Sequence, residues 1–542
     1  MKKTLLLLVL AVAIALMCTP VFAAEPVYGG AAKWHEVSNP PQLDPHMATD
    51  TTSARTALCM FDTLVTNSND GQKILPWLAE KWDVSKDGMV WTFKLRKGVR
   101  FHKTTEGGKP TANGGREVTA DDWKWSFERM IRDKSPRAYF IDCVAGYDEM
   151  AAGKAKTWSG IKAVDKYTLQ FTLKKPFAPF LSVLAYNSLV VVPKEDVTKW
   201  GKNFSFHPVG SGAFSFDTWK QDQKLTLKKN PNYWRKDAKG KQLPYLDAFE
   251  MVIIPDGTVA WEEFKKGNID MMREVPDRLV KDARKLLGKN LLEGPQPGTY
   301  YYGFNMSKPP FKGNKKLRHA LNYAVDRKRI NDLVLEGLFF PAKGILPPSM
   351  PGYNKNLKGY EYNPEKAKQL MKEAGFPNGI EVTLQINQNI RHKAVGEAIQ
   401  AQLAELGIKA NIKVVDWGVH LDMLDRGESE MYRMGWVVDY LDPDNFLFVN
   451  LHSSNFGAKG NYSFYKNPEA DKLMEQGRIE TNHAKRMAIY QKAEQLIVDD
   501  APWVFLFHYY NNVATQKWIN GAKLPAFGDY TVRMDEVWTT KK

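Results

Sequence analysis

Cysteine is scarce in this sequence, with three residues in a chain of 542. One of them, Cys18, lies in the apolar N-terminal segment, so only Cys59 and Cys143 belong to the body of the chain. A fold stapled by several disulfides is therefore excluded, and the chain is long enough to bury a core without them. Two alternatives stay open for Cys59 and Cys143, a single bridge or two buried free thiols.

The catalytic motifs that are defined by spacing are also missing. The chain has no GxSxG elbow, no phosphate loop ending in GK[ST], no GxGxxG and no HExxH. Its ten histidines form no pair at metal-ligand spacing, and the acidic run from Asp439 to Asn445 lacks the glycine turn and distal glutamate of a calcium loop. We therefore predict no metal, no cofactor and no enzymatic activity.

Acidic residues are in the minority, with 61 Asp and Glu against 76 Lys and Arg, which gives a formal net charge of +15. The lysines are spread over the whole chain and no nucleic-acid recognition motif is present, so we predict no nucleic-acid binding. This excess of positive charge could favour an anionic ligand or an anionic membrane surface, or it could have no specific role.

Long hydrophobic runs are absent except at the N-terminus. Residues 1–23 combine two lysines, the apolar run from Leu5 to Met17 and the sequence Val-Phe-Ala before Ala24, which is typical of a secretory signal peptide. The run is too short for a membrane span, which needs about 20 apolar residues. We predict a soluble, exported chain that is cleaved near Ala23. A lipid anchor on Cys18 is disfavoured because Met17 stands where that processing site requires a small residue.

Helical and strand periodicities occur throughout the chain. Thr119 and Asp122 form a capping box before a helical pattern, and a second helix is predicted from about Asn314. Between residues 363 and 415 a capped helix, an alternating strand, a helix of some 15 residues and another alternating strand follow in order. This order predicts a βαβ crossover, and the shorter hairpin-like strands elsewhere indicate mixed sheets in an α/β fold.

Six groups of residues, taken together and in order, resemble the extracellular solute-binding proteins of ABC importers, specifically the large class that includes the oligopeptide- and dipeptide-binding proteins. They are Leu43-Asp-Pro-His46, Val118-Thr-Ala-Asp-Asp-Trp-Lys-Trp-Ser126, His207-Pro-Val-Gly-Ser-Gly-Ala-Phe214 with Asn230-Pro-Asn-Tyr-Trp234, Tyr302-Gly-Phe-Asn305 with Pro310-Phe311, Leu317-Arg-His-Ala-Leu-Asn-Tyr-Ala-Val-Asp-Arg327, and Gly435-Trp-Val-Val-Asp-Tyr-Leu-Asp-Pro-Asp-Asn-Phe446. The resemblance covers nearly the whole mature chain.

The resemblance implies a two-lobed periplasmic-binding-protein clam with mixed sheets and an inserted third domain. Lobe I would comprise residues 24–60, 196–298 and 505–542, the inserted domain 61–195, and lobe II 299–504. The crossings near 298 and 504 would be hinges about which the lobes close on a ligand.

The resemblance also implies site residues. Asp439 would hold the α-ammonium of a peptide, the alternative being a loop aspartate that caps the turn before Pro443. Trp436 would border the pocket or belong to the core. Arg433, Arg391 and His392 would meet the far end or side chains of the ligand, the alternative for each being a solvated surface charge. Which arginine meets the carboxylate stays open.

Tyr300, Tyr301 and Tyr302 stand at the predicted crossing into lobe II. Alternation along a strand requires the middle one to point away from its neighbours, and we expect Tyr302 to face the cleft.

The function that the resemblance implies is that of a periplasmic component, expected to be monomeric, that binds short peptides and delivers them to the permease subunits of an ABC importer. Two alternatives stay open. Relatives bind nickel chelates, haem, glutathione, opines or oligosaccharides, and an exported hydrolase would have the same size and a cleft.

Overall fold

The computed structural model describes residues 25–71, 73–480 and 482–541. The predicted signal peptide, its cleavage site and Cys18 lie outside these residues. In the part of the chain that is described, no helix is long and apolar enough to span a bilayer.

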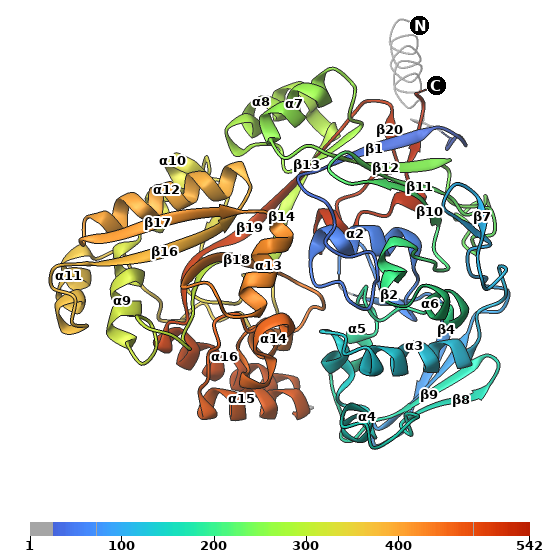
Figure 1. The fold of residues 1–542 in the computed structure, drawn as a ribbon, viewed down its shortest axis with the longest axis horizontal. Helices are drawn as coiled ribbons and strands as arrows, with labels where there is room; N and C mark the ends of the chain where they lie inside the picture. Colours follow the sequence, from blue (N-terminus) through green and yellow to red (C-terminus); the bar gives the residue numbers. More distant parts are fainter. Residues whose placement is uncertain (1–24, 72, 481, 542) are drawn as a thin grey trace, which may run out of the picture.

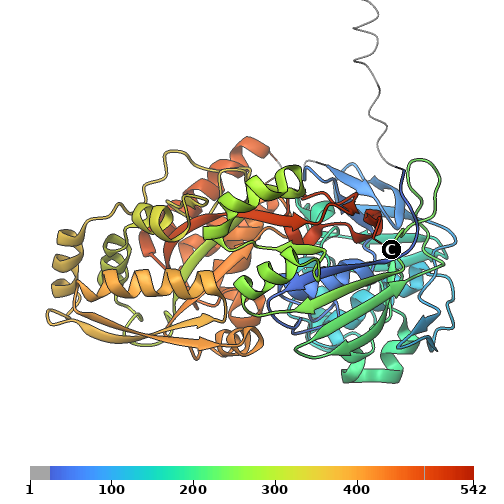
Figure 2. The ribbon, with the colours of Figure 1, turned by 90° about the horizontal axis from the view of Figure 1, so that it is seen from above.

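One large mixed sheet runs through both lobes of the molecule (Figure 1). Its two longest strands, β14 (Leu291–Phe304) and β19 (Trp503–Thr515), pair antiparallel at the centre, and Figure 2 shows β19 passing from one lobe into the other. On one side lie β13 (Met271–Arg273), β1 (Ala31–Glu36), β12 (Ala248–Ile253), β11 (Lys224–Lys229) and β10 (Phe214–Lys220). On the other lie β18 (Met431–Val437), β16 (Ile380–Asn387) and β17 (Ile408–Val415). The predicted two-lobed α/β fold with mixed sheets is confirmed.

The predicted βαβ crossover lies in the second of these groups of strands. The helix α11 (Pro364–Glu373) begins after Asn363, whose side chain accepts a hydrogen bond from the Lys366 amide. The strands β16 and β17 are parallel and are joined by α12 (Ile390–Ala404), which ends before Gly407. Gly407 has φ +75°, a conformation that favours glycine after a helix. The apolar periodicity of this segment therefore predicted its topology correctly.

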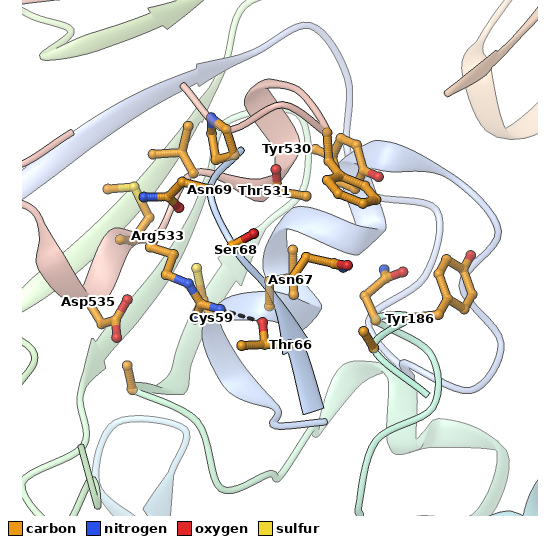
Figure 3. Close-up of a pocket in the computed structure, with 18 of the residues that line it drawn as sticks. Cys59, Thr66, Asn67, Ser68, Asn69, Tyr186, Tyr530, Thr531, Arg533 and Asp535 are labelled. Atoms are coloured by element: carbon orange, nitrogen blue, oxygen red, sulfur yellow. Dashed lines mark hydrogen bonds between the residues drawn. The ribbon is translucent and has the colours of Figure 1, made fainter. Parts of the chain in front are cut away.

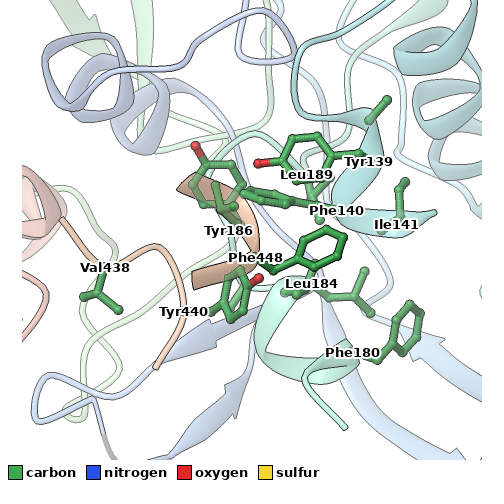
Figure 4. Packing of buried hydrophobic residues seen from close by; sticks show 14 of the residues in the cluster. Tyr139, Phe140, Ile141, Phe180, Leu184, Tyr186, Leu189, Val438, Tyr440 and Phe448 are labelled. Atoms are coloured by element: carbon green, nitrogen blue, oxygen red, sulfur yellow. The ribbon is translucent and has the colours of Figure 1, made fainter. Parts of the chain in front are cut away.

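A separate four-stranded antiparallel sheet forms the third unit. Its order is β4 (Ala79–Val84), β5 (Val90–Leu95), β9 (Thr168–Thr172) and β8 (Ile161–Asp165). The helix α3 (Ala120–Arg132) lies beside it and begins at the predicted capping box, in which the Thr119 amide donates to Asp122 Oδ2 at 2.8 Å. This unit also contacts lobe II, because Phe140 packs edge-on against Tyr440 with ring centroids 5.8 Å apart (Figure 4).

The remaining elements cover the sheets and connect them. The helices are α2 (Thr51–Met60), α4 (Tyr147–Ala151), α5 (Phe180–Val183), α6 (Lys194–Trp200), α7 (Gly257–Lys265), α8 (Val280–Leu287), α9 (Lys315–Ala324), α10 (Arg327–Val334), α13 (Trp417–Asp425), α14 (Pro443–Leu451), α15 (Pro468–Ile479) and α16 (His483–Asp500). The short strands are β2 (Val65–Asn67), β3 (Ile74–Pro76), β6 (Thr104–Thr105), β7 (Lys109–Pro110), β15 (Phe340–Pro341), β20 (Ile519–Asn520) and β21 (Trp538–Thr539). The 3-10 turns used below are η1 (Ala138–Ile141) and η3 (Asp277–Leu279).

The residue limits of the lobes stay a prediction, because β14 and β19 run through the predicted crossings at 298 and 504 without a break. The cysteine question, in contrast, is decided. Cys59 and Cys143 are both free thiols, Cys59 buried and Cys143 half-buried. Burial raises the pKa of the Cys59 thiol to about 12, so it stays protonated at neutral pH.

Candidate functional site

The cleft where the two lobes and the third unit meet holds about 1180 Å³ of empty space, counting its open mouth. Five of the six predicted site residues line it, namely Asp439, Trp436, Arg433, Arg391 and His392. The other charged side chains in its wall are Asp50, Arg137, Arg273, Glu274 and Asp529. Since the wall carries both signs of charge, the chemistry of the site depends on which of these groups already have a partner in the protein.

Among the four carboxylates of the wall, Asp439 alone is neither paired with an arginine nor used as a helix cap. Asp50 caps α2 through the amides of Thr52 and Ser53. Glu274 and Asp529 both form ion pairs with Arg273, at 3.2 and 3.1 Å. Asp439 is therefore the cleft carboxylate that is available to a cation from outside the chain.

The position of Asp439 is fixed by Asn445 on α14. The Asp439 amide donates to Asn445 Oδ1 at 2.8 Å, and Asn445 Nδ2 donates to Asp439 Oδ2 at 3.0 Å. The other carboxylate oxygen has no donor among the described residues. Burial raises the pKa of Asp439 to about 6, an effect that the positive charge of Arg137 opposes. A ligand cation would remove this penalty on the charged form.

Arg137 on the N-terminal side of η1 is a cleft residue that the sequence did not reveal. It is buried, and its guanidinium donates to the carbonyls of Thr49 at 2.9 Å and Lys459 at 3.3 Å. It also lies 5.5 Å from the ring centre of Trp436. Nothing in the spacing around Arg137 distinguishes it from a surface arginine, because its neighbours come from three distant segments.

Trp436 is 4% exposed, and its Nε1 donates to Asn445 Oδ1 at 3.2 Å. Trp436 therefore belongs to the core and also borders the pocket, the two alternatives that the sequence left open. Its ring packs in a large buried hydrophobic cluster, and the residue also lines the cleft.

Arg433 and Arg391, the two arginines left open by the sequence, differ in their partners. Arg433 forms no ion pair with any described carboxylate. It donates to Tyr509 Oη at 3.1 Å and Asn387 Oδ1 at 3.3 Å, and it stacks on Tyr300 at 4.5 Å. Arg391 instead donates twice to Asp277, with both distances 2.7 Å. The guanidinium of Arg433 is therefore the better placed of the two to receive a ligand carboxylate.

His392 lines the cleft as a neutral side chain. Its Nδ1 lies 3.1 Å from Tyr300 Oη. Burial and the nearby positive charges of Arg433 and Arg391 hold the pKa of His392 well below its usual value. His392 can therefore offer a hydrogen bond to a ligand but not a positive charge at neutral pH.

The expectation that Tyr302 faces the cleft is wrong. Tyr300 and Tyr302 point to the same side of β14, into the core of lobe II, and Tyr302 is fully buried there. Tyr301 points the other way and stacks on Trp503 with ring centroids 3.6 Å apart. The alternation itself is confirmed, but a helix-covered face of the sheet lies where the cleft was expected.

A second cavity of about 790 Å³, counting its mouth, has Tyr186 and Tyr530 in its wall (Figure 3). It shares these two residues, Asn187 and Asp439 with the cleft. Its wall includes residues 66–69 and Arg533, whose guanidinium donates to Thr66 Oγ1 at 2.5 Å. Asp439 therefore borders two cavities, so a group bound to it has space on both sides.

No group of three or more His, Cys, Asp or Glu side chains in the described residues is arranged to hold a metal ion. The cleft offers charged side chains, amides and aromatic rings. These groups suit the binding of an organic solute that carries both signs of charge.

Comparisons with known proteins show which family the chain belongs to. Residues 73–458 match the family described as bacterial extracellular solute-binding proteins, family 5 Middle. The dipeptide-binding protein of Escherichia coli strain K12 is 33% identical over 483 residues, which cover 87% of this chain and 88% of that protein. Heme-binding protein A of Haemophilus influenzae is 35% identical over 463 residues, covering 83% and 81%.

Among solved structures, the periplasmic binding protein DppA of Helicobacter pylori in complex with the peptide STSA superposes with a TM-score of 0.83. The two chains are 32% identical, and the match covers 95% of this chain and 99% of that one. The two-lobed fold, its charged cleft and these matches together identify a solute-binding protein. The chain belongs to family 5 of the bacterial extracellular solute-binding proteins.

Proposed function

We propose that this protein captures short peptides with free termini in the cleft and delivers them to the permease of an ABC importer. The observation that carries the proposal is a pair of opposite charges in the cleft wall that form no ion pair with any described residue. They are Arg433 on β18 and Asp439, two residues after the end of that strand. A peptide brings an ammonium and a carboxylate of opposite sign to them. The peptide-binding relatives support the same reading.

The N-terminal sequence supports a periplasmic location. Residues 1–23 have the composition of an export signal, and cleavage near Ala23 would release the chain without a lipid anchor. We propose a monomeric carrier that acts by binding and release rather than by catalysis. Arg137 would keep Asp439 ionised in this cycle, because its positive charge favours the carboxylate form.

The direct test is to denature the purified protein and identify the released molecules by mass spectrometry, followed by calorimetry with a panel of short peptides. We expect release of short peptides, and binding of free-ended peptides with little dependence on sequence. Recovery of haem, a sugar or a metal chelate, with no binding across the panel, would contradict the proposal. Turnover of a bound peptide would indicate a hydrolase instead.

The proposal also predicts a pH dependence of affinity. In the ligand-free protein the pKa of Asp439 is raised to about 6, and only the ionised form binds an ammonium. As the pH falls through about 6, protonation therefore competes with the ligand, and the affinity should approach a tenfold loss per pH unit. Above pH 8 the peptide amine, with a pKa of about 8, loses its own proton.

Titration calorimetry of one tripeptide between pH 5 and 8 measures this profile. Asp439→Asn is the control, since its residual affinity should be flat between pH 5 and 7. A wild-type profile that is equally flat would show that Asp439 does not carry the ligand cation.

A further inference from the structure

A third cavity lies beyond Arg391 and is separated from the cleft by that side chain. It holds about 720 Å³, counting its mouth, and shares four wall residues with the cleft, which are Val37, Glu274, Asn389 and Arg391. Its outer wall includes Pro255, Arg278 and Ile390, all exposed. One end of the ligand cleft is therefore divided from a surface-open chamber by a few side chains.

The core of this partition is an ion pair that joins two distant segments. Arg391 Nε and Nη2 each lie 2.7 Å from one oxygen of Asp277, and Arg391 Nη1 lies 3.7 Å from Glu274 Oε2. Arg391 belongs to the first turn of α12, whereas Asp277 begins η3 just after β13. The side chains of Arg391 and Asp277 are only 8% and 7% exposed, so solvent screens their attraction weakly.

Two further contacts hold the partition in place. The Arg391 guanidinium lies 4.9 Å from the ring centre of Phe339, which restricts its plane. Glu274 has φ +52°, an uncommon left-handed conformation for a residue with a Cβ. In this conformation Glu274 reaches Arg391 and is also bonded by Arg273 Nη2 at 3.2 Å. A strained backbone conformation of this kind persists where the surrounding structure enforces it. Here it places the Glu274 carboxylate at the end of the cleft.

The charges of the partition disfavour a peptide carboxylate at this point. Asp277 already takes two of the guanidinium donors, and Glu274 adds a second negative charge on the same side. A carboxylate terminus that approached Arg391 would meet both acids. Arg433 feels the charge of Glu274 as well, but it forms no ion pair with a described carboxylate, so its donors are not taken by an acid.

The chamber beyond the partition contains a cation of its own. Arg278 donates to Thr258 Oγ1 at 3.1 Å and has no acidic partner among the described residues. A peptide chain that passed the partition would therefore find a counter-charge for its C-terminus near the chamber mouth.

We propose that the Arg391–Asp277 pair is an end wall that limits the length of the bound peptide, and that the chamber behind it accepts the C-terminal residues of longer peptides when the wall is removed. The proposal rests on peptide binding as the function. It makes Arg391 a determinant of ligand length rather than the partner of the ligand carboxylate.

The test compares alanine peptides from dipeptide to hexapeptide by calorimetry, using wild-type protein and the double variant Arg391→Ala with Asp277→Ala. Removing both partners opens the wall without leaving a buried, unpaired charge. We expect the double variant to bind the longest peptides about tenfold or more tightly than wild type does, with less than about a threefold change for the shortest that wild type binds.

The matched control is Lys393→Ala with Glu397→Ala, which removes an exposed ion pair on the same helix and should leave the length profile unchanged. If the double variant fails to fold, Arg391→Lys keeps the charge but loses the bidentate contact, and should shift the profile in the same direction by a smaller amount.

Three results would overturn or limit the proposal, and they are distinguishable. An identical length profile in wild type and a folded variant overturns the wall. If the double variant loses affinity for the shortest peptides and for the longest to the same extent, Arg391 holds the ligand carboxylate instead. Absence of binding of every peptide by wild type refutes peptide binding itself.

Discussion

Asp439→Asn is expected to weaken the binding of a free-ended tripeptide at pH 7 by about a hundredfold, equivalent to ~2.7 kcal/mol. The substitution keeps the size of the side chain and an oxygen for the amide of Asn445, but it removes the negative charge that faces the cleft. The peptide ammonium would then be transferred from water into the closed site without a counter-charge. Calorimetry or a competition assay with a fluorescent peptide measures the loss.

Two controls make this result specific. Asp422→Asn removes an exposed carboxylate from the nearby α13 and should not change the affinity. An N-acetylated tripeptide, which has no ammonium, should bind wild type and Asp439→Asn with similar, weak affinity. Equal affinity of wild type and Asp439→Asn for the free-ended peptide would remove Asp439 from the site.

Arg433→Met is expected to weaken the same tripeptide by about thirtyfold, equivalent to ~2 kcal/mol. Methionine retains an unbranched apolar side chain beside Tyr300 but has no donor for a carboxylate. The expected loss is smaller than for Asp439 because Tyr509 Oη and His392 still offer hydrogen bonds in the same part of the cleft. Calorimetry at pH 7 measures it, and a thermal melt verifies that the buried site still folds.

A peptide whose C-terminal carboxylate is replaced by an amide distinguishes the contribution of the Arg433 charge to affinity from the contribution of its packing. Replacing the ligand carboxylate by an amide should cost wild type nearly as much as the substitution does, while Arg433→Met should bind acid and amide almost equally. If the amide loses as much affinity in Arg433→Met as in wild type, the carboxylate is bound elsewhere and Arg433 only shapes the wall.

Local patterns predicted the elements of the fold well. The helix after Asn363, the strands on either side of α12 and the capping box at Thr119 all depend on hydrogen bonds and apolar spacing within a few residues. The alternation of the three tyrosines on β14 was predicted for the same reason. The sequence did not predict which face of β14 meets the cleft, because that depends on the helices that cover the sheet.

The site was only partly predictable. Asp439 and Trp436 lie in one short segment that resembles a family motif, so both could be named from the sequence. Arg137 comes from the third unit, and its contacts with Thr49 and Lys459 join segments that are far apart along the chain. No spacing rule connects such residues.

The sequence by itself determined the α/β elements, their order and the kind of protein, because these follow from periodicity and from motifs read along one segment at a time. Only the tertiary structure decided which charges are free. Arg391 and Arg433 look alike in the sequence. In the structure Arg391 is neutralised by Asp277, more than a hundred positions away, whereas Arg433 bonds to Tyr509 and keeps its charge for a ligand. An ion pair depends on distance in space, and that distance is set by the packing of the two lobes.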